Sequence, residues 1–284
     1  MGRTAKIKSD LDDVNTMVEI FGILKDVAAN HFFNTAKRKE EFARFADAFT
    51  EFFRMVNLSG TKSPLVKSEV DRAGIVVISS EGGFMADITA KICRTALAEG
   101  EKYKDREYII IGYKGLEKMR ILTDAKMTAF TGIEEKGLYK ISLEVKDYII
   151  EQVKERKIGR VFVAHPRAKS LEFIKPFVVQ ILPSDELLTK QQGLKDVIEK
   201  VIVESDPNDI MDYLADIWLT CRIFEMLEDC VIAGFAAQSQ QLESSLERLK
   251  KDQKGLVIGF KKSKKSDIDK SLREVFTASK MARR

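Results

Sequence analysis

The N-terminal stretch carries apolar residues at alternating spacings of four and three, a pattern typical of one helix that packs along another. The apolar positions are Ile7, Leu11, Val14, Val18, Phe21, Ala28 and Phe32. Lys25 occupies a position of this seam where an apolar residue is expected. A helix from Lys6 to Met55, which no proline interrupts, would extend for roughly 75 Å at about 1.5 Å per residue. This length exceeds that of an ordinary globular helix, so the pattern predicts a coiled coil with Val18 and Phe21 in its core.

After residue 70 the pattern changes from helical spacing to short, continuous apolar runs. Four runs are predicted to be strands, at 74–79, 106–115, 160–165 and 176–183, the second of them ending in a glycine turn. Two amphipathic segments, 86–100 and 142–159, are predicted to be helices that each end at a glycine. Strands that alternate with helices of this length predict a small α/β domain, in which the fourth run pairs with the third as a hairpin.

The last segment returns to helical spacing. It begins with Ser205-Asp206-Pro207, in which Ser205 or Asp206 would cap a helix and Pro207 would take the first helical position. Its heptad positions are Leu214, Ile217, Cys221, Phe224, Val231, Phe235, Leu242 and Leu249, with Glu228, Gln238 and Ser245 as interruptions. A further stripe follows at Ile268, Leu272, Val275 and Phe276.

Two terminal helices therefore bracket an α/β centre. The predicted domains are an N-terminal coiled-coil helix at 1–58, a Rossmann-like α/β domain at 70–190 and a C-terminal coiled-coil helix at 205–284. Each terminal helix has a seam that needs a partner, so we expect the two to form an antiparallel coiled coil. A break at 250–260 stays open, because two glycines there each cost about 1 kcal/mol in a helix and the segment 256–260 favours a strand.

The loop Ser80-Glu81-Gly82-Gly83-Phe84 follows the first predicted strand and precedes a helix, as phosphate-binding loops do. It lacks the third glycine of the dinucleotide pattern and the Gly-Lys-Ser/Thr of a P-loop. The acidic residues at about the right distance, Glu99 and Glu101, precede the second strand instead of ending it. We therefore expect a plain turn, in which the glycines supply positive φ or close packing and Phe84 packs on the core.

Composition narrows the function further. The net charge of +4 is too small to indicate a surface that binds nucleic acids in general. The basic cluster at 261–265 is either a solvated helix face or a docking surface for an acidic partner.

Three cysteines at no metal-binding spacing, and no leading signal peptide, favour a reducing compartment. Cys221 and Cys230 are expected to face the core. His31 and His165 lack neighbouring ligands, so we expect no metal site. The sequence contains no run of 18 apolar residues, so it predicts no membrane-spanning helix.

Several weak motifs occur in an order that resembles the γ subunit of F-type rotary ATPases, the central rotor stalk. They lie at 23–32, in the double-glycine element at 76–84, in the Gly-x-Lys-Gly turn ending 109–115, in the hairpin at 161–183, and in the C-terminal helix at 255–276. The chain departs from the family's pattern at several places that contact the catalytic ring in that family. These are Leu24-Lys25-Asp26, the shortened double-glycine loop, Gly234, Gln238 and Lys264-Lys265. The resemblance is therefore to a divergent member.

The resemblance implies a non-catalytic subunit without a cofactor, which transmits torque between a membrane ion-translocating rotor ring and a hexamer of catalytic and non-catalytic ATPase subunits. It also implies a small ε-like stalk subunit as a partner. The complex would be peripheral to a membrane, on the cytoplasmic side or on the matrix side of an organelle. Lys25, Lys264 and Lys265 are the expected ring contacts, with Ile268, Leu272 and Phe224 in the coiled-coil core; ordinary helix surface and core is the alternative for these residues.

Two other functions stay open on the residues alone. A Rossmann-like nucleotide-binding enzyme would bind nucleotides in solution, although no catalytic dyad is visible. A stand-alone coiled-coil scaffold would use the α/β centre as a spacer. Nucleotide titration tests the first alternative. Co-purification tests the second, since a rotor brings a ring of ATPase subunits with it.

Overall fold

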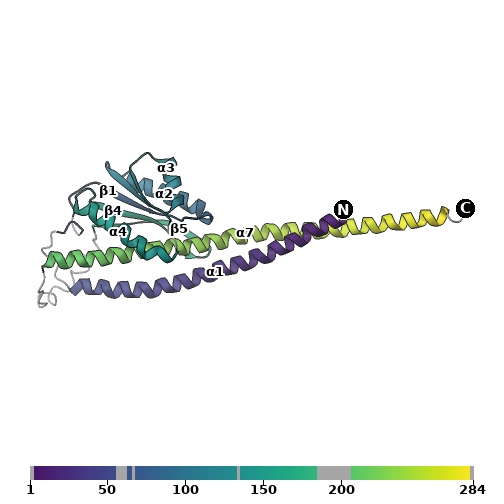
Figure 1. Cartoon of the computed structure of the whole chain (residues 1–284), viewed down its shortest axis with the longest axis horizontal. Coiled ribbons are helices and arrows are strands. Elements are labelled where there is room, and N and C mark those ends of the chain that lie inside the picture. Colours follow the sequence, from purple (N-terminus) through teal and green to yellow (C-terminus); the bar gives the residue numbers. More distant parts are fainter. Residues whose placement is uncertain (1–2, 56–62, 66–67, 133–134, 184–205, 282–284) are drawn as a thin grey trace. The chain divides into compact units, whose positions relative to one another are not determined.

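The computed structural model of the chain describes residues 3–55, 63–65, 68–132, 135–183 and 206–281 (Figure 1). Its two longest elements are the helices α1 (Arg3–Met55) and α7 (Pro207–Met281). The chain forms two compact units, Met1–Ala28 with Ser239–Arg284 and Ala29–Gln238, which are called the helical unit and the α/β unit below. Both long helices contribute to each unit.

A five-stranded sheet forms the centre of the α/β unit, in the order β3-β2-β1-β4-β5. Its strands are β1 (Ala73–Ile78), β2 (Arg106–Ile111), β3 (Met127–Phe130), β4 (Arg160–Ser170) and β5 (Phe173–Leu182). The first four are parallel, and β5 pairs antiparallel with β4, so the predicted hairpin is confirmed. Every residue of β1 is buried, which explains its uninterrupted apolar sequence.

Helices cover both faces of this sheet. They are α2 (Ala86–Gly100), α3 (Tyr113–Leu122), α4 (Leu138–Lys154) and the first part of α7. Figure 1 shows α2 and α3 on one side of the strands and α4 and α7 on the other. Right-handed crossovers require α4 to lie on the side opposite to α2 and α3, because the strand order reverses direction after β3. Neither α3 nor β3 was predicted from the sequence.

The first part of α7 is a core element of the α/β unit. Its residues in the main apolar core include Leu214, Ala215, Trp218, Leu219, Ile223, Met226, Leu227 and Cys230. Pro207 takes the first helical position as predicted, and Asp206 Oδ1 accepts a hydrogen bond from the Asn208 backbone N–H at 2.7 Å. Cys221 and Cys230 are buried as expected. Ser205, the other predicted cap, lies outside the described residues.

The helix α7 continues without a break through 250–260, so the segment whose structure the sequence left open is helical. Gly255 and Gly259 have open space around them, and each carries the usual entropic cost of about 1 kcal/mol. Long stretches of good helix formers on both sides, together with the partner helix, outweigh that cost. The seam of this part is buried at Leu242 and Leu246.

In the helical unit, α1 and α7 pair antiparallel, as the two seams predicted. Lys25 Nζ lies 2.6 Å from Glu243 Oε2, and the Gln253 side-chain N–H donates to Asn15 Oδ1 at 2.7 Å. At the start of α1, the Thr4 hydroxyl lies 2.6 Å from the Ser263 hydroxyl. The residue numbers of the contacting pairs therefore decrease along α1 as they increase along α7, which makes the two helices antiparallel.

The residues predicted for the coiled-coil core lie in different surroundings. Val18 and Phe21 are half-buried in the helical unit. Phe224 is half-buried in the α/β unit, where its ring packs edge-on against Phe42, with centroids 5.0 Å apart, and against Tyr139, with centroids 6.3 Å apart.

Ile268 and Leu272 were expected in that core, and this is wrong for the chain by itself. Their side chains are 52% and 57% exposed. Thr4 already lies beside Ser263 and Asp267, so the described residues of α1 end where this stripe begins.

The polar network around Glu107 sits inside the sheet region and allows a test of this fold. Glu107 is 1% exposed, and Tyr148 Oη and Thr128 Oγ1 donate to its Oε1 at 2.6 and 3.1 Å. Lys126 Nζ lies 3.1 Å and Arg72 Nη2 3.6 Å from its Oε2. Burial raises the pKa of Glu107, but the hydrogen bonds from Tyr148, Lys126 and Thr128 outweigh it and leave the pKa below its ordinary value.

We therefore expect Glu107→Gln to lower the free energy of unfolding of the α/β unit by about 1–3 kcal/mol at pH 7. A carboxyl with a lowered folded-state pKa stabilises the fold above its unfolded-state pKa and loses this effect as the pH falls through the folded value. The difference between the two proteins should therefore shrink below about pH 4. Urea unfolding followed by the fluorescence of Trp218, the chain's one tryptophan, measures it.

The matched control is Glu144→Gln, which alters a partly exposed carboxylate that pairs with Lys140 along α4. It should change the free energy of unfolding by less than about 0.5 kcal/mol. A Glu107→Gln effect no larger than this, or one that does not change with pH, would contradict the role given to the network.

Candidate functional site

The double-glycine loop was the first candidate for a ligand site, and its backbone is ordinary. Gly82 has φ −113° and ψ −177°, and Gly83 begins a short 3-10 helix that ends at Met85. Among the described glycines, only Gly112 and Gly132 have positive φ. A Cβ on Gly82 or Gly83 would meet nothing within 4 Å. The expected need for positive φ or close packing in this loop is therefore wrong.

The predicted anchor of the loop is also wrong. Phe84 is 53% exposed, whereas its neighbour Met85 is 2% exposed and belongs to the core. An apolar residue next to a turn can face the core or the solvent, and no local pattern distinguishes which of Phe84 and Met85 is buried.

The close backbone approach occurs instead between the end of β1 and the start of α3. Ser79 is buried, its Oγ donates to the Ile111 carbonyl at 3.0 Å, and it accepts from the Gly115 backbone N–H at 2.8 Å. Gly112 has φ +98°, and a Cβ there would overlap the Ser79 carbonyl oxygen. The Gly-x-Lys-Gly turn was the sequence signal for this contact, and it serves the packing of α3 on β1.

The N-terminus of α3 has an anionic group beside it, whereas the phosphate site that the double-glycine loop suggested would be the N-terminus of α2. Glu81 Oε2 accepts a hydrogen bond from the Tyr113 backbone N–H at 3.3 Å. The Lys114 backbone N–H donates to the Ser80 carbonyl at 3.1 Å. A phosphate at the N-terminus of α3 would therefore have to displace Glu81.

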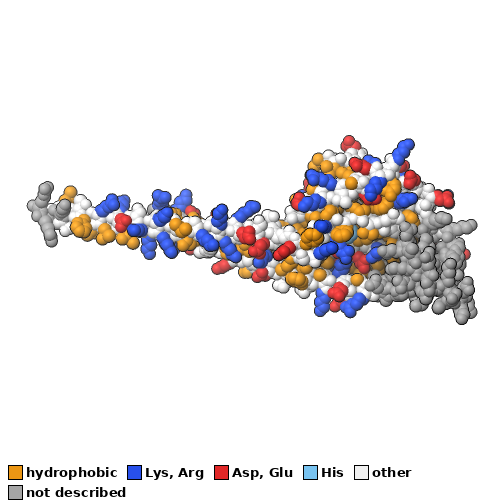
Figure 2. Space-filling model, turned by 180° about the vertical axis from the view of Figure 1, so that it is seen from behind, with side chains coloured by type: hydrophobic (Ala, Val, Ile, Leu, Met, Phe, Trp, Pro, Cys, Tyr) orange, Lys and Arg blue, Asp and Glu red, His pale blue; other side chains and the backbone are white. Residues whose placement is uncertain are grey.

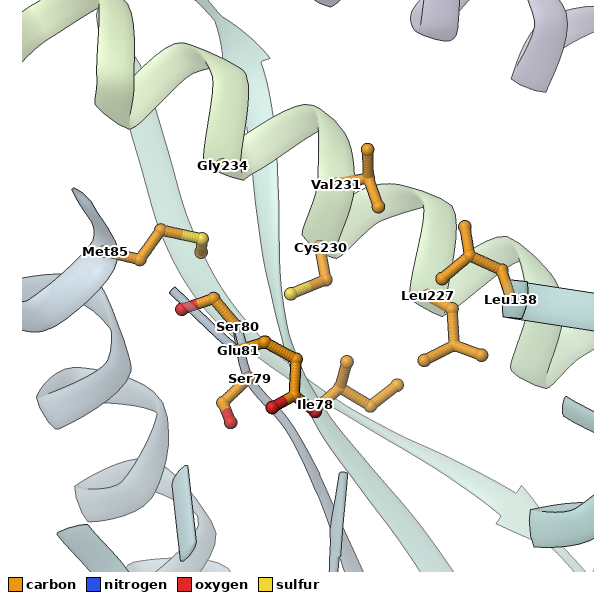
Figure 3. Close-up of a pocket in the computed structure, with 10 residues that line it drawn as sticks. All are labelled: Ile78, Ser79, Ser80, Glu81, Met85, Leu138, Leu227, Cys230, Val231 and Gly234. Carbon is orange, nitrogen blue, oxygen red and sulfur yellow. The ribbon is translucent and has the colours of Figure 1, made fainter. Parts of the chain in front are cut away.

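A small cavity of about 170 Å³ lies between this loop and α7 (Figure 3). Figure 3 shows Met85 from the loop side and Cys230 and Leu227 from α7 around it. Burial raises the pKa of the Cys230 thiol to about 12, so it stays protonated and unreactive at neutral pH. Gly234, one of the positions that depart from the family pattern, also lines the cavity. The lining is mainly apolar, and it suits packing better than catalysis.

The predicted ring contacts do not form one site. Lys25 lies within the helix pair, where a hydrogen bond from Lys25 to Glu243 and the charge of Glu243 raise its pKa. Lys264 and Lys265 are exposed on α7. They follow Glu243 by about 20 residues, which places them roughly 30 Å further along that helix. Figure 2 shows Lys and Arg side chains gathered along this part of α7.

Beyond Lys265 the C-terminal part of α7 exposes an apolar stripe, of which Ile268 and Leu272 were expected in the coiled-coil core. Its members are Ile268, Leu272, Val275 and Phe276, which are 52% to 74% exposed. Residues spaced by three and four lie on one face of a helix, and a contiguous exposed apolar face marks a surface that another molecule covers. Basic side chains beside an apolar face make this end of α7 the strongest candidate interaction site.

Metal binding and membrane insertion are two further possibilities for the described part of the chain. No group of three or more His, Cys, Asp or Glu side chains there is arranged to hold a metal ion. Among the described helices, none has a segment long and apolar enough to cross a membrane.

Comparisons with known proteins point in one direction. A family model described as ATP synthase matches residues 3–280. The ATP synthase gamma chain of Mannheimia succiniciproducens is 23% identical over 282 residues, which cover 97% of this chain and 98% of that one. The rotor of the Euglena gracilis mitochondrial ATP synthase shares the fold with a TM-score of 0.60 at 16% identity, over 94% of this chain and 99% of that chain. A chain in the OSCP/F1/c-ring structure of the same enzyme gives a TM-score of 0.60 at 14% identity, over 98% and 94% of the two chains.

The opposite roles of the two glycine turns can be tested by alanine substitution. Gly112→Ala should lower the free energy of unfolding by about 2–4 kcal/mol, because alanine is strained at positive φ and its Cβ would overlap the Ser79 carbonyl. Gly82→Ala should change it by less than about 1 kcal/mol, since its φ suits alanine and the space is open. Urea unfolding of the two variants measures both. Equal effects would contradict this assignment.

Proposed function

The chain belongs to the ATP synthase family, whose model matches residues 3–280, and from this premise we propose that it is the γ chain of a rotary ATPase. In this role it is the non-catalytic central stalk that transmits torque between a membrane rotor ring and a hexamer of nucleotide-binding subunits. The observation that carries the proposal is the antiparallel pairing of the chain's two ends, with the end of α7 left uncovered. Curated relatives that match along almost their whole length bear the name ATP synthase gamma chain.

The dimensions and stiffness of α7 suit a shaft. At about 1.5 Å per residue, its 75 residues extend for roughly 110 Å. In the helical unit, side-chain contacts from Thr4, Asn15 and Lys25 join α1 to α7 at three separate levels. Two helices joined in this way resist bending and twisting better than one helix, which is what torque transmission needs.

The exposed end of α7 supplies the surface for the ring. Lys264 and Lys265 attract acidic groups over a distance without fixing a single geometry, which suits a surface that moves past its partner. Ile268 and Leu272, which the chain itself leaves exposed, become contact residues for the inside of the ring. Lys25 is also kept as a ring contact, with Glu243 orienting its ammonium group.

The α/β unit would face the other partners, the membrane rotor ring and a small ε-like stalk subunit. The comparison structure of the Euglena gracilis enzyme is described as containing F1 and a c-ring, so that chain belongs to such an assembly. By analogy, we place this chain in a complex peripheral to a membrane, on the cytoplasmic side or on the matrix side of an organelle.

A non-catalytic role is supported by the turn after β1 and the cavity beside it. The turn lacks the third glycine of the dinucleotide pattern and the Gly-Lys-Ser/Thr of a P-loop, and Cys230, which lines the cavity, is a buried thiol of high pKa. We therefore expect no tight nucleotide binding by the chain alone. Stoichiometric binding in a calorimetric titration with ATP, ADP or NAD would favour a Rossmann-like enzyme instead.

Co-purification tests the proposal directly. The chain, isolated from its native cells under mild conditions, should bring with it a ring of ATPase subunits at about six ring subunits per chain. Mass spectrometry of the intact complex measures that ratio. A folded chain that is recovered alone, or with unrelated coiled-coil proteins, would favour a stand-alone scaffold.

The double variant Lys264→Glu, Lys265→Glu tests the ring contact. Reversing both charges should lower the number of ions pumped per ATP hydrolysed by about twofold or more in a reconstituted complex, because attraction to acidic rims becomes repulsion. Lys264→Arg with Lys265→Arg keeps the charge and should keep that ratio. Unchanged assembly with an unchanged ratio in the glutamate variant would rule out the contact.

A further inference from the structure

Two consecutive basic residues of α1 face two consecutive acidic residues of α7 within the α/β unit. Arg38 Nε lies 3.2 Å from Glu228 Oε1, and Lys39 Nζ lies 2.5 Å from Asp229 Oδ1. The Glu228 side chain is 1% exposed and that of Asp229 is 11% exposed. These are partly buried pairs, unlike the surface pairs along single helices elsewhere in the chain, such as Asp87 with Lys91.

Asp229 also reaches a third element. His165, on β4, places its Nδ1 3.7 Å from Asp229 Oδ2, and its side chain is 5% exposed. Each oxygen of this carboxylate therefore has a different neighbour, a lysine of α1 and a histidine of the sheet. We call Asp229, Lys39 and His165 the Asp229 junction, where α1, α7 and β4 meet.

Apolar contacts surround the junction. Phe32 of α1 packs with Ile232 and Ala236 of α7, and partly buried residues of the β4–β5 hairpin cover this cluster. The His31 ring stacks on Phe235 with centroids 4.9 Å apart. Apolar contacts of this kind allow small shifts along a helix, because they have no fixed geometry. A charge pair shielded from water is stronger and is lost when the register changes.

We propose that the Asp229 junction fixes the register of α1 on α7 and ties both helices to the sheet, so that torque on the α/β unit enters both helices of the stalk together. The proposal rests on the proposed function for its mechanical part. Asp229 is a positioning residue in this account. A shift of α1 by one helical turn would leave Asp229 buried without Lys39, so sliding of one helix on the other is opposed at this level.

The first experiment needs only the isolated full-length chain. Amide hydrogen exchange over residues 29–44 of α1 should become at least about tenfold faster in Asp229→Asn, because the isosteric amide loses the ion pair with Lys39. The swap Lys39→Asp with Asp229→Lys should restore at least half of the protection. Asp87→Asn, the same substitution in an exposed pair of α2, should leave it unchanged. Exchange equal to that of the unaltered chain in Asp229→Asn would overturn the junction.

The second experiment measures the assembled complex. With the ring fixed to a surface and no ATP present, thermal angular fluctuations of a marker on the α/β unit should have at least about twice the variance in Asp229→Asn, and near-normal variance in the swap. If exchange in α1 is faster but the variance of the angular fluctuations is unchanged, the claim that the junction carries torque into both helices is overturned, while its role in fixing the register stands. If the unaltered chain never joins a ring, the proposed function fails. The exchange result still shows whether the Asp229 junction fixes the register of α1 on α7.

If Asp229→Asn does not fold, Lys39→Met replaces it, because this substitution removes the same pair from the more exposed side. Its exchange over residues 29–44 should also be at least about tenfold faster. Exchange at the normal rate in a folded Lys39→Met chain would overturn the junction.

Discussion

The helix α7 must bury an apolar face against two different partners along one uninterrupted length. Its first part completes the core beneath the sheet, through residues such as Trp218 and Leu227. Its later part packs in the helical unit, where Leu242 and Leu246 are buried. Because the helix does not break at Gly255 or Gly259, the same helix contributes to both the α/β unit and the helical unit. Any role that depends on passing force between the two units follows from this continuity.

Polar residues within the apolar seams set the register of the helix pair. Lys25 and Glu228 interrupt otherwise apolar heptad positions, and each has an opposite charge on the other helix, at 2.6 Å for Lys25 and 3.2 Å for Glu228. An apolar seam alone tolerates sliding and alternative pairings, whereas charged residues at a few levels favour one alignment. The interruptions therefore specify how the two helices align.

Much of this fold could be predicted from periodicity, because long helices and buried parallel strands give strong patterns. The hairpin and the start of α7 at Pro207 were predicted correctly. The four-residue strand β3 lies at the sheet edge with a mixed pattern, Met-Thr-Ala-Phe, so it gave no periodic signal. The end of the coiled coil depends on the register, and the register depends on pairs such as Thr4 with Ser263, which no local pattern reveals.

The candidate site was less predictable than the fold. The double glycine attracted a ligand hypothesis, yet the strained glycine is Gly112, whose φ depends on the packing of α3 against Ser79. Ile268 and Leu272 have the spacing of core residues, and spacing alone cannot distinguish a partner helix in the same chain from a partner subunit. Ring contacts belong to an assembly, so Lys25, Lys264 and Lys265 stay predictions that a single chain leaves open.

Direct observation of rotation is the most decisive measurement. The three cysteines are buried, so Lys104→Cys in the exposed loop after α2 gives a selective attachment point for a bead. In a complex whose ring is fixed to a surface, the account predicts that adding ATP makes the bead rotate in one direction for as long as hydrolysis continues. A complex that hydrolyses ATP at its normal rate while the attached bead only fluctuates would contradict it.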